Sequence, residues 1–208
     1  MSEALGKIEK PEAQDFKQGK KLFLVPLVFM PVEMDAGLMK LIQRYWEEAE
    51  AHLKMLEEKL SQAKKLYHEL ITGAEEKGLK DIEKLSGDSF ELIKRRIESG
   101  ARLEKTEDEA LLGEFLDWGR CLALGLQSEA AFSLIYDAYV KVQKKRNEFI
   151  VGKINETLGQ GEAGILFIRE GHGLQFPVDI QVFYVAPPAL DEIKRYLREP
   201  KTKDETKT

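Results

Sequence analysis

The chain has 208 residues but only one cysteine, three histidines and seven prolines. Cys121 alone cannot form an internal disulfide, so the fold needs no oxidising compartment and we expect a cytoplasmic protein. The longest apolar run, 22–32, is broken by Pro26 and Pro31 and is far shorter than the roughly 20 residues that cross a bilayer. The sequence therefore predicts no membrane span.

Neither sign of charge is in large excess: 32 Lys and Arg face 37 Asp and Glu, a net charge of −5. This balance argues against a nucleic-acid partner. The basic cluster at 141–146 has no interleaved aromatic platform and is interpreted as a solvated helix face. The acidic run 107–109 is interpreted as a first helical turn, where the helix dipole favours negative charge. Neither cluster predicts a site.

The segment from Asp35 to Lys77 predicts one long helix. It contains no proline, its glycines lie near its two ends, and Asp35 suits an N-cap. Apolar residues recur at coiled-coil spacing for about five heptads. These residues form two rows along the helix. One row is Met39, Trp46, Leu53, Leu60, Tyr67 and Ala74, and the other is Ile42, Ala49, Leu56, Ala63 and Leu70. Such a helix would be about 60 Å long, so part of it must project or pair with another helix.

A second long helix is predicted over 129–158, with Ser128 as its N-cap, and it is the natural antiparallel partner of the first. Capping-box patterns predict two shorter helices between them. One pattern is Asp88 with Glu91, and the other is Thr106 with Glu109.

Three segments predict strands, because they are dense in β-branched and aromatic residues. They are 22–30, 163–169 and 180–186. Pro26 cannot donate to a ladder, so the first strand is expected at a sheet edge or with a bulge. A last helix is predicted to start at Pro187–Pro188.

The expected fold class is α+β and mainly helical. A long antiparallel helical hairpin with two shorter helices accompanies a small three-stranded sheet formed by the N- and C-terminal parts of the chain. We expect a flexible tail over 1–20, a single domain over 21–198 with a helical insertion over 36–158, and a flexible charged tail over 199–208.

The glycine motif over 159–164 has the letters of a dinucleotide fingerprint, G-x-G-x-x-G. It follows a predicted helix and leads into a strand, whereas the fingerprint follows a strand and opens a helix. The nucleotide interpretation is therefore rejected.

Histidine spacing also gives no metal site. His52 and His68 are preceded three residues earlier by Ala49 and Lys65, where a di-iron bundle needs glutamate. His68-Glu69 begins a zincin-like motif, but Thr72 stands where the second histidine is needed. We expect no cofactor and no metal.

The loop that begins Arg169-Glu-Gly-His172-Gly leaves the carboxyl end of a predicted strand, where α/β sheets place ligand sites. His172 could be a general base, a proton donor or a ligand, oriented by Glu170 or Asp179. These three residues are the candidate catalytic set. The alternative is an ordinary connection whose histidine bonds a carbonyl, and this alternative is favoured because most loop residues carry no function.

Two functions follow. The first is a soluble intracellular interaction or scaffold protein, in which the helical hairpin binds a protein partner or a second copy of the chain. The second is a small-molecule or metal-binding enzyme with a site at 169–179, with help from Glu33 or Asp35 after the first strand. No nucleophile motif decides whether the chain is an enzyme.

Overall fold

The computed structural model describes residues 18–28, 34–85 and 87–198 and contains a five-stranded sheet in which every pairing is parallel. The strands are β1 (Lys20–Leu27), β2 (Ala63–His68), β3 (Arg102–Leu103), β4 (Ala163–Arg169) and β5 (Ile180–Tyr184). Their order across the sheet is β3-β2-β4-β1-β5. The chain therefore has an α/β fold with β4 at the centre of the sheet and β2 and β1 on either side of it.

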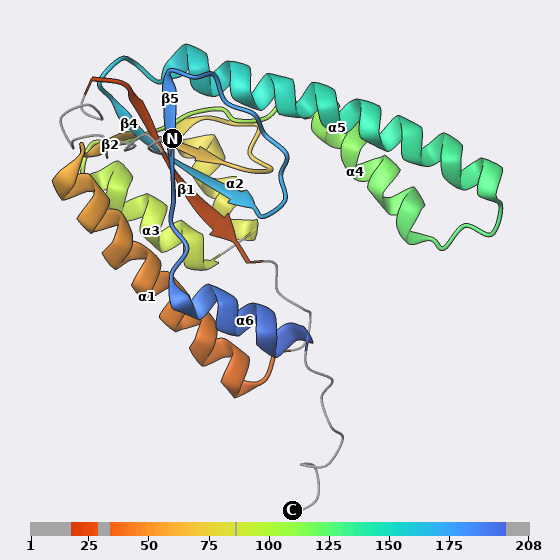
Figure 1. Cartoon of the computed structure of the whole chain (residues 1–208), viewed down its shortest axis with the longest axis horizontal. Coiled ribbons are helices and arrows are strands. Elements are labelled where there is room, and N and C mark those ends of the chain that lie inside the picture. Colours follow the sequence, from red (N-terminus) through yellow and green to blue (C-terminus); the bar gives the residue numbers. More distant parts are fainter. Residues whose placement is uncertain (1–17, 29–33, 86, 199–208) are drawn as a thin grey trace, which may run out of the picture.

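Helices cover both faces of the sheet (Figure 1). The helices are α1 (Ala36–Lys59), α2 (Glu75–Leu85), α3 (Gly87–Glu98), α4 (Glu109–Ala123), α5 (Glu129–Thr157) and α6 (Pro188–Arg198). Buried side chains of α1, α2, α3 and α6 join one core, and those of α5 join the core on the other face. α4 packs along α5, and this α4–α5 hairpin extends beyond the sheet (Figure 1).

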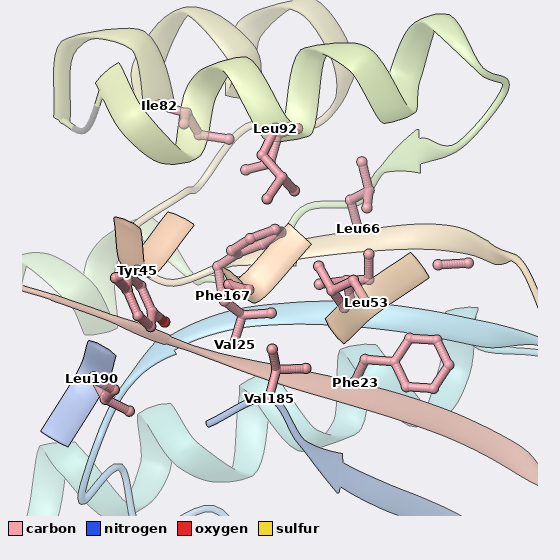
Figure 2. Close-up of a cluster of buried hydrophobic side chains, with 14 of the residues drawn as sticks. Phe23, Val25, Tyr45, Leu53, Leu66, Ile82, Leu92, Phe167, Val185 and Leu190 are labelled. Atoms are coloured by element: carbon pink, nitrogen blue, oxygen red, sulfur yellow. The ribbon is translucent and has the colours of Figure 1, made fainter. Parts of the chain in front are cut away.

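The alternation of β1 explains the two cores. Phe23 and Val25 point to the face covered by α1, whereas Leu22 and Leu24 point to the face covered by α5. All four are at most 1% exposed, as expected for a central strand of a parallel sheet covered on both faces. Figure 2 shows the α1 side of this core, with Phe23, Val25 and Phe167 of the sheet among side chains of several helices.

The predicted α+β fold with a three-stranded sheet and a long helical hairpin is wrong. The segment 36–77 is not one helix, because α1 ends at Lys59 and residues 63–68 form β2. In β2, Leu66 faces one core and Tyr67 the other, so sheet burial overrides a residue pattern that also fits a helix. Neither proline nor glycine marks the break.

The predicted pairing of the two long helices is also wrong. α1 and α5 contribute to cores on opposite faces of the sheet, and the hairpin that does form joins α4 to α5. The predicted insertion over 36–158 instead contains β2 and β3, both part of the same sheet. Tails are predicted over 1–20 and 199–208; residues 1–17 and 199–208 lie outside the described residues, and Lys20 already belongs to β1.

Pro26 lies in an interior strand whose pairing with β4 is regular, contrary to the expectation of a sheet edge or a bulge. The ladder between β1 and β5 ends at Leu24, whose carbonyl accepts from Val185 N at 2.9 Å. Because residues 24 and 26 direct their backbone groups to the same side of β1, the backbone N of Pro26 faces the side of β5. The pairing with β5 has already ended at that point, so the missing N–H of Pro26 costs the sheet no hydrogen bond. Tyr45 Oη donates to the Pro26 carbonyl at 2.5 Å.

Other local predictions are confirmed. Asp35 caps α1, Ser128 caps α5, and α6 begins at Pro188. Three of the predicted strands correspond to β1, β4 and β5, although residues 29 and 30 lie outside the described part. Among the described helices, none is long and apolar enough to span a membrane.

Candidate functional site

At the carboxyl edge of the sheet, the connections that follow the neighbouring strands β2 and β4 leave toward opposite faces. After β2 the chain continues into α2 and α3 on one face. After β4 it crosses the other face through the 170–179 connection, which buries Leu174, and reaches β5. Ligand sites of parallel sheets lie where connections diverge in this way. Glu69 follows β2 directly, and Arg169 is the last residue of β4.

Four charged side chains meet at this edge of the sheet, and we call them the carboxyl-edge cluster: Glu69, Glu107, Arg146 and Arg169. Glu69 Oε1 accepts from Arg146 Nη2 at 3.0 Å and from Arg169 Nε at 2.5 Å. Glu69 Oε2 accepts from the backbone N–H of Arg169 at 2.8 Å. Glu69 therefore ties α5 and β4 to the end of β2.

Glu107 completes the cluster from the segment before α4. Arg146 donates from Nε to Glu107 Oε2 at 2.8 Å and from Nη2 to Glu107 Oε1. The backbone N–H of Leu70 donates to Glu107 Oε1 at 3.1 Å. Both glutamate side chains are 0% exposed and Arg146 is 4% exposed, whereas Arg169 is 32% exposed. Arg169 is thus the cluster member that solvent or a ligand reaches.

Burying the four charges of this cluster costs free energy, and the pairing of the two arginines with the two glutamates offsets that cost. Burial alone would lower the pKa of Arg146, but the hydrogen bonds and charges of Glu107 and Glu69 raise it above its ordinary value. A buried ion-pair network is seldom more stabilising than apolar residues of the same shape. Such a network at the strand ends, with one member lining a hollow, therefore favours a functional site over a purely structural role.

Leu70, next to Glu69, has a strained backbone. Its φ is +70°, a left-handed conformation that is rare for a non-glycine residue. The hydrogen bond from its N–H to Glu107 holds it there. Strain of this kind costs of order 1–3 kcal/mol and clusters at functional sites.

A hollow of about 420 Å³ adjoins the cluster, and we call it the α4 cavity. It is lined by Leu70, Phe115, Leu116, Gly119, Arg120, Ala123, Tyr139 and Arg169. The guanidinium carbons of Arg146 and Arg169 lie 4.6 and 5.3 Å from the Phe115 ring centroid, a cation–π arrangement. Arg169 therefore belongs both to the cluster and to the wall of a cavity of ligand-binding size.

His172 lies half-buried in the loop after β4. Its Nδ1 accepts from Leu174 N–H at 2.9 Å, so the neutral ring carries its proton on Nε2. Burial lowers the pKa of His172, and the charge of Glu69 partly opposes this shift. Gly171 and Gly173 on either side have positive φ, +69° and +67°, which a tight loop around the ring requires. His172 lines a second hollow of about 310 Å³, the His172 cavity.

The other two predicted catalytic residues are not brought to the ring of His172. Glu170 is exposed, lines the His172 cavity and accepts from Lys194 Nζ at 2.7 Å. Asp179 lies just before β5 and is 3.3 Å from Lys20 Nζ, at the amino edge of the sheet. Asp35 accepts from Leu38 N–H and Tyr196 Oη, and Glu33 lies outside the described residues.

The residues that sequence reasoning missed all carry charge. Arg146 is buried rather than part of a solvated basic face, and Glu107 is buried rather than the first turn of α4, whose N-cap is Asp108. A signal from position exists only for Arg169, which ends the apolar run of residues 163–168, where a strand delivers side chains to a carboxyl edge. The segment before Glu69 contains two lysines and gives no such signal.

The described residues contain no group of three or more His, Cys, Asp and Glu side chains placed to hold a metal ion. In comparisons with protein-family models, curated proteins and solved structures, we found no significant match. The geometry of the carboxyl edge is therefore the basis for any function considered below.

Proposed function

We propose that the chain is an enzyme that acts on a small molecule at the carboxyl edge of the sheet, with His172 as hydrogen-bond donor to the reacting group and Arg169 as ligand-binding cation. The observation that carries this proposal is the buried carboxyl-edge cluster, which shares Arg169 with the α4 cavity and is followed in the chain by the loop that lines the His172 cavity. Polar groups converging on a cavity at such a place are typical of active sites.

The hydrogen bonds give each side chain a distinct role. The N–H of Leu174 occupies Nδ1 of His172, so the Nε2–H of the neutral ring is available to donate to a developing negative charge. Its lowered pKa keeps the ring neutral at neutral pH. Glu69 holds Arg169 through Nε, and a guanidinium so fixed binds carboxylates and phosphates well.

The test replaces His172 with asparagine, whose side-chain oxygen can still accept from Leu174 N–H but which has no Nε2–H. We expect the parent to bind and convert at least one compound in a metabolite panel, followed by thermal shift and mass spectrometry. His172→Asn should lower turnover at least about a hundredfold, the order of magnitude for removing one hydrogen-bond donor to a developing negative charge. His52→Asn on α1 is the matched control and should leave turnover unchanged.

Equal turnover in the parent and His172→Asn would remove the basis of the proposal. His172→Ala separates catalysis from loop structure, because it also removes the acceptor for Leu174 N–H. We expect it to lower the melting temperature as well as turnover, whereas His172→Asn lowers turnover alone.

A second candidate function is self-association through the α4–α5 hairpin. Leu124 and Leu134 near its tip are 78% and 72% exposed, and Phe132 and Tyr136 on α5 are about half exposed. Two copies of the hairpin packed side by side would bury these residues in a four-helix arrangement. This observation favours a second copy of the chain as the partner.

Sedimentation equilibrium tests the second candidate. We expect a dimer for the parent and a monomer for Leu124→Lys/Leu134→Lys, because each lysine would place a charge in the apolar contact. Leu85→Lys is the control, since Leu85 is also exposed but lies on α2. A parent chain that stays monomeric at high concentration contradicts self-association.

A further inference from the structure

We propose that the α4 cavity takes the ring of an aromatic organic anion whose negative group lies against Arg169 and Arg120. The inference rests on the proposed function, because it names the class of compound that the carboxyl edge binds. It assigns the ring and the anion to the α4 cavity, which Arg169 lines.

The charges that line the α4 cavity select an anion. Arg120 and Arg169 are its two charged lining residues, and no carboxylate among the described residues lines it. Glu69 and Glu107 lie behind the wall, fully buried; both accept from Arg146, and Glu69 also accepts from Arg169 Nε at 2.5 Å. Arg120 pairs with Asp117 at 2.7 Å, but both side chains are about three-quarters exposed, so this pair is weak and a ligand anion can replace it.

The uncharged walls select a ring. Phe115 and Tyr139 stack with centroids 5.0 Å apart and an interplanar angle of 28°, and both line the cavity. Leu70, Leu116 and Ala123 supply the remaining apolar surface. Leu70 reaches the cavity wall from its strained backbone conformation, which Glu107 maintains. A flat apolar body against these walls would remove apolar surface from water.

Gly119 keeps the space open. It lies within α4 and lines the cavity, and a Cβ built there would approach only Tyr139 Cε2 among the described atoms, at 3.8 Å. A larger side chain therefore fits the helix but occupies the cavity. The groove along α5, of about 670 Å³, differs from the α4 cavity in its charge. It is lined by one cation, Lys144, and one anion, Glu148, so it favours neither sign of charge in a ligand.

The experiment measures binding of phenyl phosphate, inorganic phosphate and benzyl alcohol to the full chain by isothermal titration calorimetry. Phenyl phosphate supplies both the ring and the anion, whereas each of the others supplies one of them. We expect phenyl phosphate to bind at least tenfold more tightly than either. Equal affinity for inorganic phosphate would show that the ring is not recognised and would overturn the inference, as would no binding of phenyl phosphate.

Two leucine substitutions on α4 locate the bound ring. Gly119→Leu fills the cavity and should weaken phenyl phosphate binding at least tenfold. Gly113→Leu is the matched control, because no atom of the described residues lies within 4 Å of a Cβ at Gly113 and the residue does not line the cavity. Both changes replace a helical glycine, so a shared effect of helix stabilisation would appear in both variants. Equal binding by the parent and Gly119→Leu would overturn the inference.

Arg120→Gln and His172→Asn separate this inference from the proposed function. Arg120→Gln should weaken binding and reduce its dependence on salt, because one of the two cationic contacts is lost. If Gly119→Leu blocks binding while turnover is insensitive to His172→Asn, the cavity assignment stands and the proposed catalytic role fails. If turnover needs His172 but Gly119→Leu binds phenyl phosphate normally, the catalytic role stands and the cavity assignment fails.

Discussion

Replacing Arg146 with methionine should lower the free energy of unfolding by about 3–5 kcal/mol. Arg146 donates two hydrogen bonds to Glu107 and one to Glu69, and both carboxylates are fully buried. Methionine keeps the aliphatic bulk against Phe115 but leaves two buried negative charges with only Arg169 to balance them. Urea denaturation at neutral pH measures the loss.

A second substitution restores the balance of charge and shows that charge is the cause. In Arg146→Met/Glu107→Gln, the remaining pair is Glu69 with Arg169, one charge of each sign. The glutamine introduced by Glu107→Gln can still accept from Leu70 N–H through its side-chain oxygen. We expect the double variant to recover at least half of the lost stability. Arg120→Met, at an exposed pair, is the control and should unfold as the parent does.

A small loss in Arg146→Met would contradict this account, because it would mean that water reaches the two glutamates once the guanidinium is gone. A double variant no more stable than the single variant would also contradict it, since the loss would then come from packing against Phe115. The two results distinguish an electrostatic cluster from a tightly packed one.

Local sequence patterns predicted the elements whose signals are local. β4 is a continuous apolar run between glycine and arginine, and α1 and α5 have side-chain caps at Asp35 and Ser128. β2 has no such signal, because its sequence AKKLYH contains helix-forming lysines and fits a heptad. Its strand conformation depends on pairing with β4 and β3, which are distant in the sequence.

The sequence does not predict β2, and so it does not predict the position of Glu69, which follows this strand. The loop after β4 was predicted at the carboxyl end of a strand, and the structure places His172 there. Glu69 could not be placed beside Arg169 while it was assigned to the middle of a helix. Arg146 and Glu107 are 39 residues apart and form a buried pair, and sequence spacing does not reveal a contact at that separation. The residue that ends a strand can be predicted from the sequence more readily than the distant residues that contact it.

His68 is a buried group whose effect on stability depends on pH. It is 2% exposed, and burial lowers its pKa to about 4 despite the hydrogen bond to the Glu69 carbonyl. That carbonyl only accepts, so Nδ1 of the neutral ring carries the proton, and Nε2 faces Ser89 Oγ at 3.4 Å. The ring also stacks on Phe167, with centroids 5.9 Å apart. The folded protein therefore accepts a proton on this ring only at about pH 4 and below.

Lowering the pH from 7.5 to 5 should reduce the free energy of unfolding by about 2 kcal/mol through His68. The unfolded chain binds a proton on this side chain near its ordinary pKa of 6.5, whereas the folded chain does so only near 4. The stabilising contribution is complete above about pH 6.5 and is lost progressively as the pH falls toward about 4. His172 adds a loss of the same sign, because burial lowers its pKa as well.

Urea denaturation of the parent and His68→Asn at several pH values isolates the contribution of His68. Asparagine keeps a donor near the position of Nδ1 but has no group that titrates in this range. The variant is expected to be less stable at pH 7.5, since it loses the stacking on Phe167, and to lose about 2 kcal/mol less than the parent on acidification to pH 5. Two curves that fall in parallel would show that the ring is solvated or that its proton is accommodated in the folded state. The difference between the slopes, rather than the stability at one pH, therefore measures how strongly the end of β2 excludes a positive charge on His68.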